Sequence, residues 1–266
     1  GEWGLCIYIE YGEKHILLDT GASDLFVQNA EKLGLDLTAV DAAVLSHAHY
    51  DHANGMEAFF RCNSRAKFYV GHTCGADCYY KKLFLRRYIG VPKTVLQDFQ
   101  DRVVYAGKEP MEILPGVYLA PHKTVGLARV GRRENMYRRT NGRWVPDDFS
   151  HEQSLVLETE EGLVIFNSCS HAGADNIINE VAAAFPEFNV FVGGSSSFDL
   201  APKPYDKRYA LERYCAAHGI ALSEAAFCGD DYGPGGNDEC VYRAGVRFFK
   251  VDDYRRFGET VAELLR

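Results

Sequence analysis

The sequence has no apolar run near the roughly 20 residues that a membrane-spanning helix needs, and its first ten residues contain neither a basic segment nor a long apolar one. No membrane anchor is therefore expected. The sequence also has no excess of positive charge, because 29 basic residues stand against 37 acidic ones and the net charge is -8. Binding to phosphate backbones or anionic membranes needs such an excess, so neither nucleic acid nor membrane is an expected partner.

Linkers and repeats are also missing. No Ser, Gly or Pro tract divides the chain, and no repeat of fixed period is evident. The 266 residues, 47% hydrophobic and 25% charged, supply enough apolar side chains for a buried core. We therefore expect a single domain over residues 1–266 and interpret the start at Gly1 as a trimmed N-terminus.

Eight cysteines occur at irregular spacing. A chain of this length does not need disulfide staples, so free thiols and a cytoplasmic location are favoured over a disulfide framework. Cys74 and Cys78, with His72 and Cys62 nearby, have a spacing compatible with structural zinc. No second close cysteine pair accompanies them, so free thiols remain the preferred interpretation here too.

The hydrophobic pattern alternates between strands and helices. Residues 5–18 predict a hairpin that turns near Gly12, and residues 39–46 predict a short apolar strand covered on both faces. A second hairpin is predicted for residues 154–168, with its turn at Glu161 and Gly162. Helices are expected within residues 23–34, 76–90, 176–185 and 205–219, and residues 126–148 are expected to be the least regular stretch.

A dense group of metal-type side chains follows the strand at residues 39–46. His47, His49, Asp51 and His52 form the pattern H-x-H-x-D-H. Alternate side chains of an extended segment share a face, so His47 and His49 can bind one metal ion while Asp51 and His52, beyond the bend, face a second. Exposed histidines in a polar loop are the alternative. Four ligand-type residues within six positions disfavour that alternative and suit zinc, iron or manganese.

This loop closely resembles the hallmark of the metallo-β-lactamase superfamily. The segments ILLDTG before it and SLVLETEEGLVIF after it are also similar to that family, so the resemblance runs from about Leu5 to the last helix. Within the superfamily, EQSLVLETEEGLVIFNSCSHAG is most similar to the branch named after a dihydropterin ribofuranosylaminobenzene phosphate synthase. The resemblance implies an α/β fold, a four-layer αββα sandwich with the metals at one edge of its two sheets.

The resemblance also assigns site residues. It implies that His47 and His49 hold the first metal, that Asp51 and His52 hold the second, and that Asp51 also steers or deprotonates the catalytic water. His151 fits the place of the third histidine ligand of the first metal. The bridging residue of the family is usually Asp, whereas this hairpin ends in Ser168, Cys169, Ser170 and His171.

Cys169 is therefore a candidate bridge as a thiolate, and His171 is an alternative ligand. Asp19, at the end of the strand aimed at the metals, is expected to hydrogen bond to a ligand imidazole. A simple turn-forming role for Asp19 is the alternative. The last histidine ligand of the family has no counterpart in residues 190–200 or 225–236. Cys228, Asp230 and Asp231 are its candidate replacements, and the second metal is expected to be held less firmly than the first.

An arginine-rich segment precedes His151 on an otherwise acidic chain. Guanidinium groups pair with phosphate or carboxylate in a two-pronged geometry, so this segment is a candidate for binding an anionic substrate. Tyr137 and Trp144 beside it are suited to stack on a planar ring. A solvated loop is the alternative. The arginines concerned are Arg129, Arg132, Arg133, Arg138, Arg139 and Arg143, with Arg132, Arg133, Arg138 and Arg139 as the chosen candidates.

Together these features predict a metal-dependent hydrolase with one or two transition-metal ions, zinc foremost and manganese or iron as alternatives. The expected substrate is a small anionic molecule with an ester, phosphoester or lactone-type bond. A di-iron redox protein is one alternative, although no flavin domain is evident. A metal-binding module that has lost catalysis is another, because of the missing late histidine. No Gly-rich phosphate loop or G-x-S-x-G elbow suggests a competing chemistry.

Overall fold

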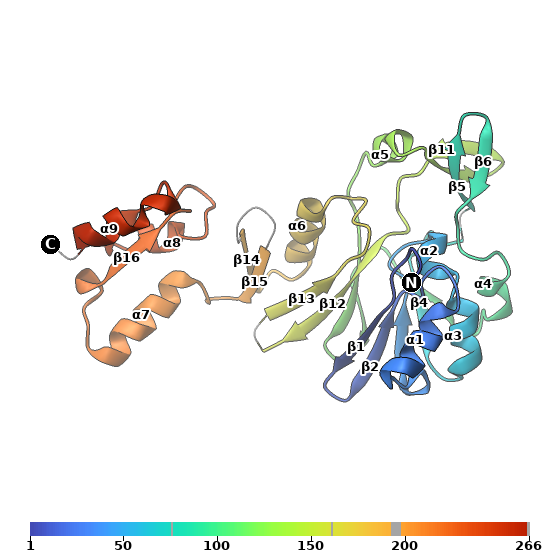
Figure 1. The fold of residues 1–266 in the computed structure, drawn as a ribbon, viewed down its shortest axis with the longest axis horizontal. Coiled ribbons are helices and arrows are strands. Elements are labelled where there is room, and N and C mark those ends of the chain that lie inside the picture. The colour runs from blue at the N-terminus through green and yellow to red at the C-terminus, as the bar shows by residue number, and fades with distance from the viewer. Residues whose placement is uncertain (76, 161, 193–197, 265–266) are drawn as a thin grey trace. The chain divides into compact units, whose positions relative to one another are not determined.

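The computed structural model describes residues 1–75, 77–160, 162–192 and 198–264 (Figure 1). It divides into two compact units, which are described one at a time. The first is Gly1–Glu158 with Val164–Ala184, and the second is Thr159–Leu163 with Phe185–Arg266. The single domain expected over residues 1–266 stays a prediction. In the part of the chain that the structure describes, no helix is long and apolar enough to cross a membrane.

The first unit contains a five-stranded sheet of order β1-β2-β3-β4-β7. Its strands are β1 (Ile7–Tyr11), β2 (Lys14–Leu18), β3 (Ala42–Val44), β4 (Lys67–Val70) and β7 (Val103–Tyr105). The predicted hairpin is confirmed, since β1 and β2 pair antiparallel around Gly12, whose φ of 60 suits glycine. The parallel strands β2, β3 and β4 place β3 between two neighbours, which explains why all three of its residues are buried.

A second sheet packs against the first. Its order is β13-β12-β9-β8, formed by β8 (Met111–Leu114), β9 (Val117–Pro121), β12 (Gln153–Thr159) and β13 (Gly162–Phe166). Side chains alternate along β2: Ile16 and Leu18 join residues of the second sheet such as Leu119 in one apolar cluster. Leu17 points the other way and packs with the helices. The layer order is therefore helix, sheet, sheet.

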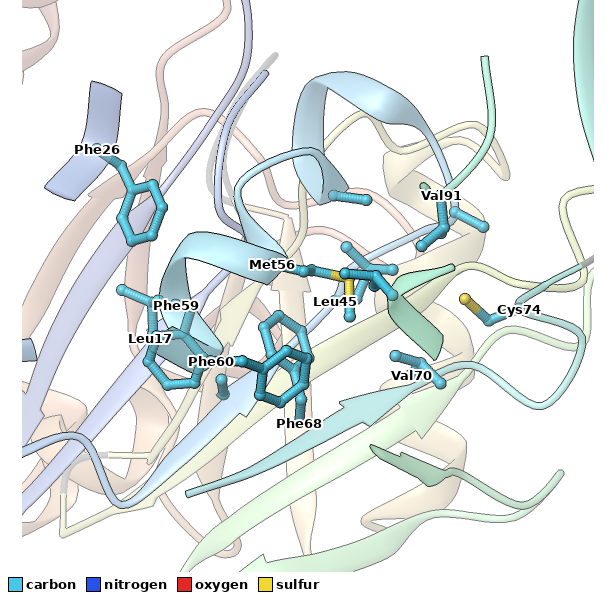
Figure 2. Close-up of a cluster of buried hydrophobic side chains, with 14 of the residues drawn as sticks. Leu17, Phe26, Leu45, Met56, Phe59, Phe60, Phe68, Val70, Cys74 and Val91 are labelled. Carbon is cyan, nitrogen blue, oxygen red and sulfur yellow. The ribbon is translucent and has the colours of Figure 1, made fainter. Parts of the chain in front are cut away.

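The helical layer on the first sheet consists of α1 (Leu25–Leu33), α2 (Tyr50–Ala53) and α3 (Met56–Cys62). Phe26 of α1 and Met56, Phe59 and Phe60 of α3 are buried with Phe68 of β4 in one cluster (Figure 2). The predicted end of α1 at Gly34 is confirmed by its left-handed backbone, φ 72. Ser23 Oγ accepts a hydrogen bond from the Leu25 amide, although the capping position itself is Asp24.

A third, smaller sheet corrects two predictions. Residues 76–90, expected to be helical, contain the strands β5 (Asp77–Lys82) and β6 (Leu85–Tyr88), and the stretch expected to be irregular contains α5 (Ala128–Arg133), β10 (Met136–Thr140) and β11 (Arg143–Pro146). The four strands pair in the order β11-β10-β5-β6. Ring contacts across them, Tyr79 with Tyr88 at 5.4 Å and Tyr79 with Trp144 at 4.9 Å, stabilise the sheet over helix.

Two glycines let backbone segments approach the stretch between β11 and β12. A Cβ atom at Gly71, just after β4, would lie 2.4 Å from the carbonyl oxygen of His151. A Cβ atom at Gly131 of α5 would lie 2.1 Å from the carbonyl oxygen of Asp147. Real Cβ atoms do not approach so closely, so both positions need glycine. The segment from Asp147 to His151 is thus held from two sides by backbone.

The remaining elements complete the two units. The first unit also has η1 (Leu37–Ala39), α4 (Val95–Asp98) and α6 (Ala174–Ala184), and α6 buries Ile177 and Val181. In the second unit, β14 pairs antiparallel with β15 and β16 pairs parallel with β17. Its elements are β14 (Phe188–Val192), β15 (Phe198–Pro202), α7 (Lys207–His218), η2 (Leu222–Glu224), β16 (Ala226–Gly229), α8 (Glu239–Tyr242), β17 (Arg247–Lys250), η3 (Tyr254–Arg256) and α9 (Phe257–Leu264).

Candidate metal centre

The histidine loop leaves the end of β3 inside the protein. Its backbone is extended at His49, with φ -109 and ψ 150, and α2 begins at the next residue. The loop is tied down on both sides: the Ser46 carbonyl accepts a hydrogen bond from the Gln153 amide, and the Tyr50 amide donates one to Ile89. His47, His49 and His52 are buried as a result, each no more than 4% exposed. The alternative interpretation, a polar loop with exposed histidines, is therefore wrong for these three residues.

Three imidazoles converge at the end of this loop. Ligand nitrogens of His47, His49 and His171 lie within 4.8 Å of one another. The Nε2 atom of each ring is buried and has no hydrogen-bond partner among the described residues. A buried polar atom without a hydrogen-bond partner is costly, so three such atoms on rings whose ligand nitrogens lie this close together fit a shared metal ion. Sequence reasoning placed His171 only as an alternative ligand, and the structure brings it to the first pair.

Burial keeps these rings neutral. It lowers the pKa of His47 well below its ordinary value of 6.5, and the neighbouring imidazoles add to the effect. Burial likewise lowers the pKa of His171 to about 4. Burial also lowers the pKa of His49, against an opposing contribution from Asp147. A neutral imidazole has a lone pair for a metal, so the three histidines are ready to bind an ion at neutral pH.

His171 is held in place by the segment that precedes β12. The Phe149 ring stacks on His171 at 4.2 Å between centroids and 9° between planes. The His171 amide donates to Oε1 of Glu152, whose other oxygen lies 3.0 Å from Nδ1 of His122. Burial would raise the pKa of Glu152, but its contacts with His122 and His171 lower it. Glu152 is therefore an ionised, buried anchor for the chain around His171.

A second group contains His47, His52 and Cys169. His52 Nε2 faces the Asp51 carboxylate at 3.5 Å and the Cys169 sulfur at 3.6 Å. Its Nδ1 atom lies 2.7 Å from Oδ2 of Asp19. Burial alone would lower the pKa of His52, but hydrogen bonds to Asp19, Asp51 and Cys169 raise it to about 11.

Asp19 contacts more than His52. Its Oδ1 accepts a hydrogen bond from the Ser46 amide and its Oδ2 one from the Ser46 hydroxyl, each at 2.7 Å. This carboxylate therefore links the end of β2, the start of the loop and one ligand-type imidazole. That is the contact expected of Asp19 from the sequence, and a role limited to turn formation does not account for it.

A third group lies on the other side of His49 and includes residues that the sequence analysis did not select. Ligand atoms of His49, Cys78, Asp147 and His151 lie within 4.8 Å of one another, and all four residues are buried. His151 Nε2 is 3.3 Å and His49 Nε2 is 3.7 Å from Oδ2 of Asp147. Burial raises the pKa of the Cys78 thiol well above 9. The sequence offers Cys78 only for a structural zinc site with Cys74, with a free thiol as the preferred interpretation, and not as a neighbour of His49. Asp147 had no distinguishing motif beyond its place four residues before His151.

The candidate substrate arginines separate into two kinds. Arg138 on β10 is 8% exposed, and its guanidinium pairs with Asp147 at 3.5 Å and with Asp148 at 2.6 Å. Arg138 is thus part of the buried network beside His151. Arg132, Arg133 and Arg139 are exposed, and the Arg139 guanidinium lies 5.9 Å from the Trp144 ring.

The replacements proposed for the late histidine belong to the second compact unit. There the Asp230 and Asp231 amides donate to Oδ2 of Asp238, and Cys228 lies on β16. The segment at residues 190–200 falls partly outside the described residues, which omit 193–197. A ligand role for Cys228, Asp230 or Asp231 stays a prediction.

Comparison with known proteins agrees with the fold. The family model described as the metallo-beta-lactamase superfamily matches residues 4–135, which lie in the first unit. A second family model, eukaryotic phosphomannomutase, matches residues 160–251, a shorter stretch that falls mostly in the second unit. The family resemblance expected from Leu5 to the last helix is therefore matched by the superfamily model only in the first half of the chain.

Individual relatives cover more of the chain. The 7,8-dihydropterin-6-methyl-4-(beta-D-ribofuranosyl)-aminobenzene-5'-phosphate synthase of Methanocaldococcus jannaschii is 23% identical over 77% of this chain and 75% of its own length. An uncharacterized protein of the same organism is 24% identical over 72% of this chain and 71% of its own length.

One solved structure has a similar fold. Tm1679, described as a metal-dependent hydrolase of the beta-lactamase superfamily, matches with a TM-score of 0.54 and 24% identity, over 91% of this chain and 90% of that one. The expected fold class, a mixed α/β structure of the metallo-β-lactamase type, is confirmed. With the superfamily model matching residues 4–135, this part of the chain, which holds the histidine loop, belongs to the metallo-beta-lactamase superfamily, and the structure has a fold of that type.

Proposed function

We propose that this protein is an enzyme, a metal-dependent hydrolase that cleaves an ester, phosphoester or lactone-type bond in a small anionic substrate. The observation that carries the proposal is the set of three buried Nε2 atoms, on His47, His49 and His171, that have no hydrogen-bond partner among the described residues. Their chemistry suits a zinc ion, and manganese or iron are the alternatives. The fold-level similarity to Tm1679, described as a metal-dependent hydrolase, supports the same reading.

A bound transition-metal ion lowers the pKa of coordinated water from about 15.7 toward 7 and polarises the bond to be cleaved. Asp51 is the residue suited to handle the proton. Its side chain is 13% exposed and contacts Nε2 of His52. Burial would raise the pKa of Asp51, but its contacts with His52 lower it below its ordinary value. Asp51 is therefore ionised at neutral pH, so it can orient a water molecule or accept its proton.

A second ion would be held by Asp51, His52 and Cys169. Asp19 favours this arrangement because it accepts the proton of Nδ1 and leaves Nε2 of His52 to face Asp51 and Cys169. This ligand set consists of one imidazole from His52, one carboxylate from Asp51 and one sulfur from Cys169. With the late histidine of the family missing from the sequence, we propose that this second ion binds more weakly than the first.

The substrate class rests on charge. Arg132, Arg133 and Arg139 are exposed cations close in sequence to the centre, on a chain whose net charge is -8. A substrate with a phosphate or carboxylate group would be attracted there. The curated relative is named after a product that carries a 5'-phosphate, which agrees with an anionic substrate.

Metal analysis combined with a substrate panel tests the proposal. The protein should contain at least one transition-metal ion per chain, and the variant His47→Ala with His49→Ala should contain none. His218→Ala, at the exposed end of α7, is the matched control and should retain the metal. A panel of phosphomonoester, phosphodiester, lactone and thioester substrates should then show hydrolysis by wild type and by His218→Ala only. Metal that is bound without turnover of any class would contradict the hydrolase.

That last outcome would favour the second candidate, a metal-binding protein without catalysis. The observation in its favour is the incomplete second ligand set, since a two-metal mechanism needs both ions about 3.5–4 Å apart. A di-iron redox protein is distinguished by the metal itself, because it requires iron, and zinc could not support its chemistry.

A further inference from the structure

The two ring nitrogens of His151 have different partners. Nδ1 lies 3.1 Å from the backbone nitrogen of Ala48, whose N–H points at it. Nε2 lies 3.3 Å from Oδ2 of Asp147. Ala48 stands between His47 and His49, so this one ring contacts the middle of the metal-binding loop. His151 itself is fully buried.

These partners determine which of the two ring nitrogens of His151 carries the hydrogen. A backbone amide can only donate, so Nδ1 of His151 must have a free lone pair and Nε2 must bear the hydrogen. The Asp147 carboxylate, whose Oδ2 lies 3.3 Å from Nε2, is the fitting acceptor for this hydrogen. A ring arranged in this way has no lone pair left for a metal ion. Binding one would require removal of a second proton or loss of the bond to Ala48.

We propose that His151 is a positioning residue, which fastens the histidine loop through Ala48, and that His171 is the third imidazole ligand of the first ion. The inference rests on the proposed metal centre and changes the role that sequence resemblance gives to His151. The ligands of the first ion are then His47, His49 and His171, the three rings whose buried Nε2 atoms have no hydrogen-bond partner among the described residues.

The anchor of His151 serves both halves of this ligand set. Oδ1 of Asp147 accepts a hydrogen bond from the Phe149 amide at 2.9 Å and lies 3.5 Å from Nε of Arg138. The Phe149 ring stacks on His171. Asp147 thus connects to the loop through His151 and to the third ligand through Phe149. Displacing His151 would move the loop that carries His47 and His49, although the ring itself touches no ion.

Cadmium-113 is the probe for a direct test by NMR, because cadmium replaces zinc and the spin of its nucleus couples to that of a bound nitrogen-15. In metal-stripped wild-type protein labelled with nitrogen-15 at histidine and reloaded with this ion, His47, His49 and His171 should each show coupling between nitrogen and cadmium. His151 should show none, and its Nε2 should remain protonated before and after loading. A coupling to either nitrogen of His151 would overturn the proposal, and this measurement does not depend on any variant folding.

Two substitutions give a second test. Asn at position 151 places an oxygen near the place of Nδ1, so His151→Asn can still accept from Ala48 but offers no imidazole. His151→Asn should bind the first metal within about threefold of wild type, and His151→Ala should lose about 10- to 100-fold in affinity, as residues that support ligands do. His171→Asn should no longer bind the first metal ion. If His151→Asn loses the metal as completely as His171→Asn, His151 is a ligand after all.

The outcomes separate this inference from the proposed function. Cadmium coupling confined to His47, His49 and His171 supports the role of His151 even if no substrate is ever hydrolysed. Hydrolysis together with coupling to His151 would support the proposed function and overturn the positioning role. Thermal unfolding of each metal-free variant identifies those whose loss of metal comes from loss of the fold.

Discussion

Oδ2 of Asp19 lies 2.7 Å from Nδ1 of His52, and both groups are buried. The carboxylate therefore determines which nitrogen of His52 faces Asp51 and Cys169. Because Asp19 follows directly after β2 and also binds Ser46 at the end of the neighbouring strand, it fixes the orientation of this imidazole relative to the sheet.

Asp19→Asn should weaken the second metal ion more than the first. An amide holds the His52 proton less strongly than a carboxylate, and loss of such a partner typically costs about 10- to 100-fold in metal affinity. Titration of stripped protein with zinc would measure both sites. Asp36→Asn, an exposed carboxylate that contacts Thr38, is the control and should change neither. Equal weakening of both ions by Asp19→Asn would contradict a role directed at His52.

Metal binding at the two sites should depend on pH in different ways. Burial keeps His47 and His171 neutral, with the pKa of His171 at about 4, so protons hardly compete for the first site near pH 7. The pKa of His52 in the metal-free protein is about 11, so this residue must release a proton when it binds an ion. Cys169 must also lose its thiol proton to bind as a thiolate. Affinity at the second site should therefore rise at least about tenfold for each pH unit between 7 and 8, and the first site should depend on pH much less.

Calorimetry in buffers of different ionisation enthalpy would check this directly. At pH 7 the first ion should release clearly fewer protons than the second, because the second must displace one from His52 and one from the Cys169 thiol. Equal proton release by the two ions would contradict neutral imidazoles at the first site and a protonated His52 at the second.

Arg138→Met should destabilise the metal-free protein by about 3–5 kcal/mol, because it leaves the buried Asp147 carboxylate without its cation. Arg139→Met on the same strand is the matched control. Its exposed side chain meets only the Trp144 face among the described contacts, so the change should cost no more than about 1 kcal/mol. Urea unfolding with a chelator present measures both. If both variants lose a similar free energy of unfolding, the buried pair of Arg138 and Asp147 contributes no more to stability than an exposed arginine does.

Replacing Arg132, Arg133 and Arg139 together by Gln should raise KM for an anionic substrate at least about tenfold, since each charge-assisted hydrogen bond contributes about 1.5–3 kcal/mol. KM for a neutral substrate of the same class should change little. Removing three exposed arginines of the second unit, Arg208, Arg213 and Arg255, controls for net charge. Equal changes for both substrates would show that this segment does not bind substrate.

The sequence could predict the histidine loop because its ligands are close along the chain and follow one buried strand. The same holds for Asp19, whose place at the end of β2 aims it at that loop. Cys78 and Asp147 could not be selected in this way. They meet His49 and His151 only after β5, β10 and β11 pair, and the hairpin that carries Cys78 resembled a basic helix. Most residues of its two strands are exposed or only partly buried, so the sequence shows little apolar alternation, and Leu83, Phe84 and Leu85 are exposed.

His151 illustrates a different limit. Residue type and spacing mark it as a ligand, whereas its hydrogen-bond partners, Ala48 and Asp147, argue for a different role. One of these partners is a backbone amide, and the direction of a backbone amide is not visible in a residue pattern. The choice between His151 and His171 therefore needed the three-dimensional structure.

The candidate metal centre also depends on Gly71, a residue that contributes no polar side-chain atom to it. With the His151 carbonyl oxygen 2.4 Å from where a Cβ would stand, the spacing between the end of β4 and the segment before β12 is set by two main chains in contact. Even a methyl group at position 71 would push these two main chains apart. That shift would tilt the ring of His151 and, through Ala48, displace the histidine loop. Metal affinity can therefore be lost at a residue that has no side chain and no charge, which makes position 71 a steric control point for the metal centre.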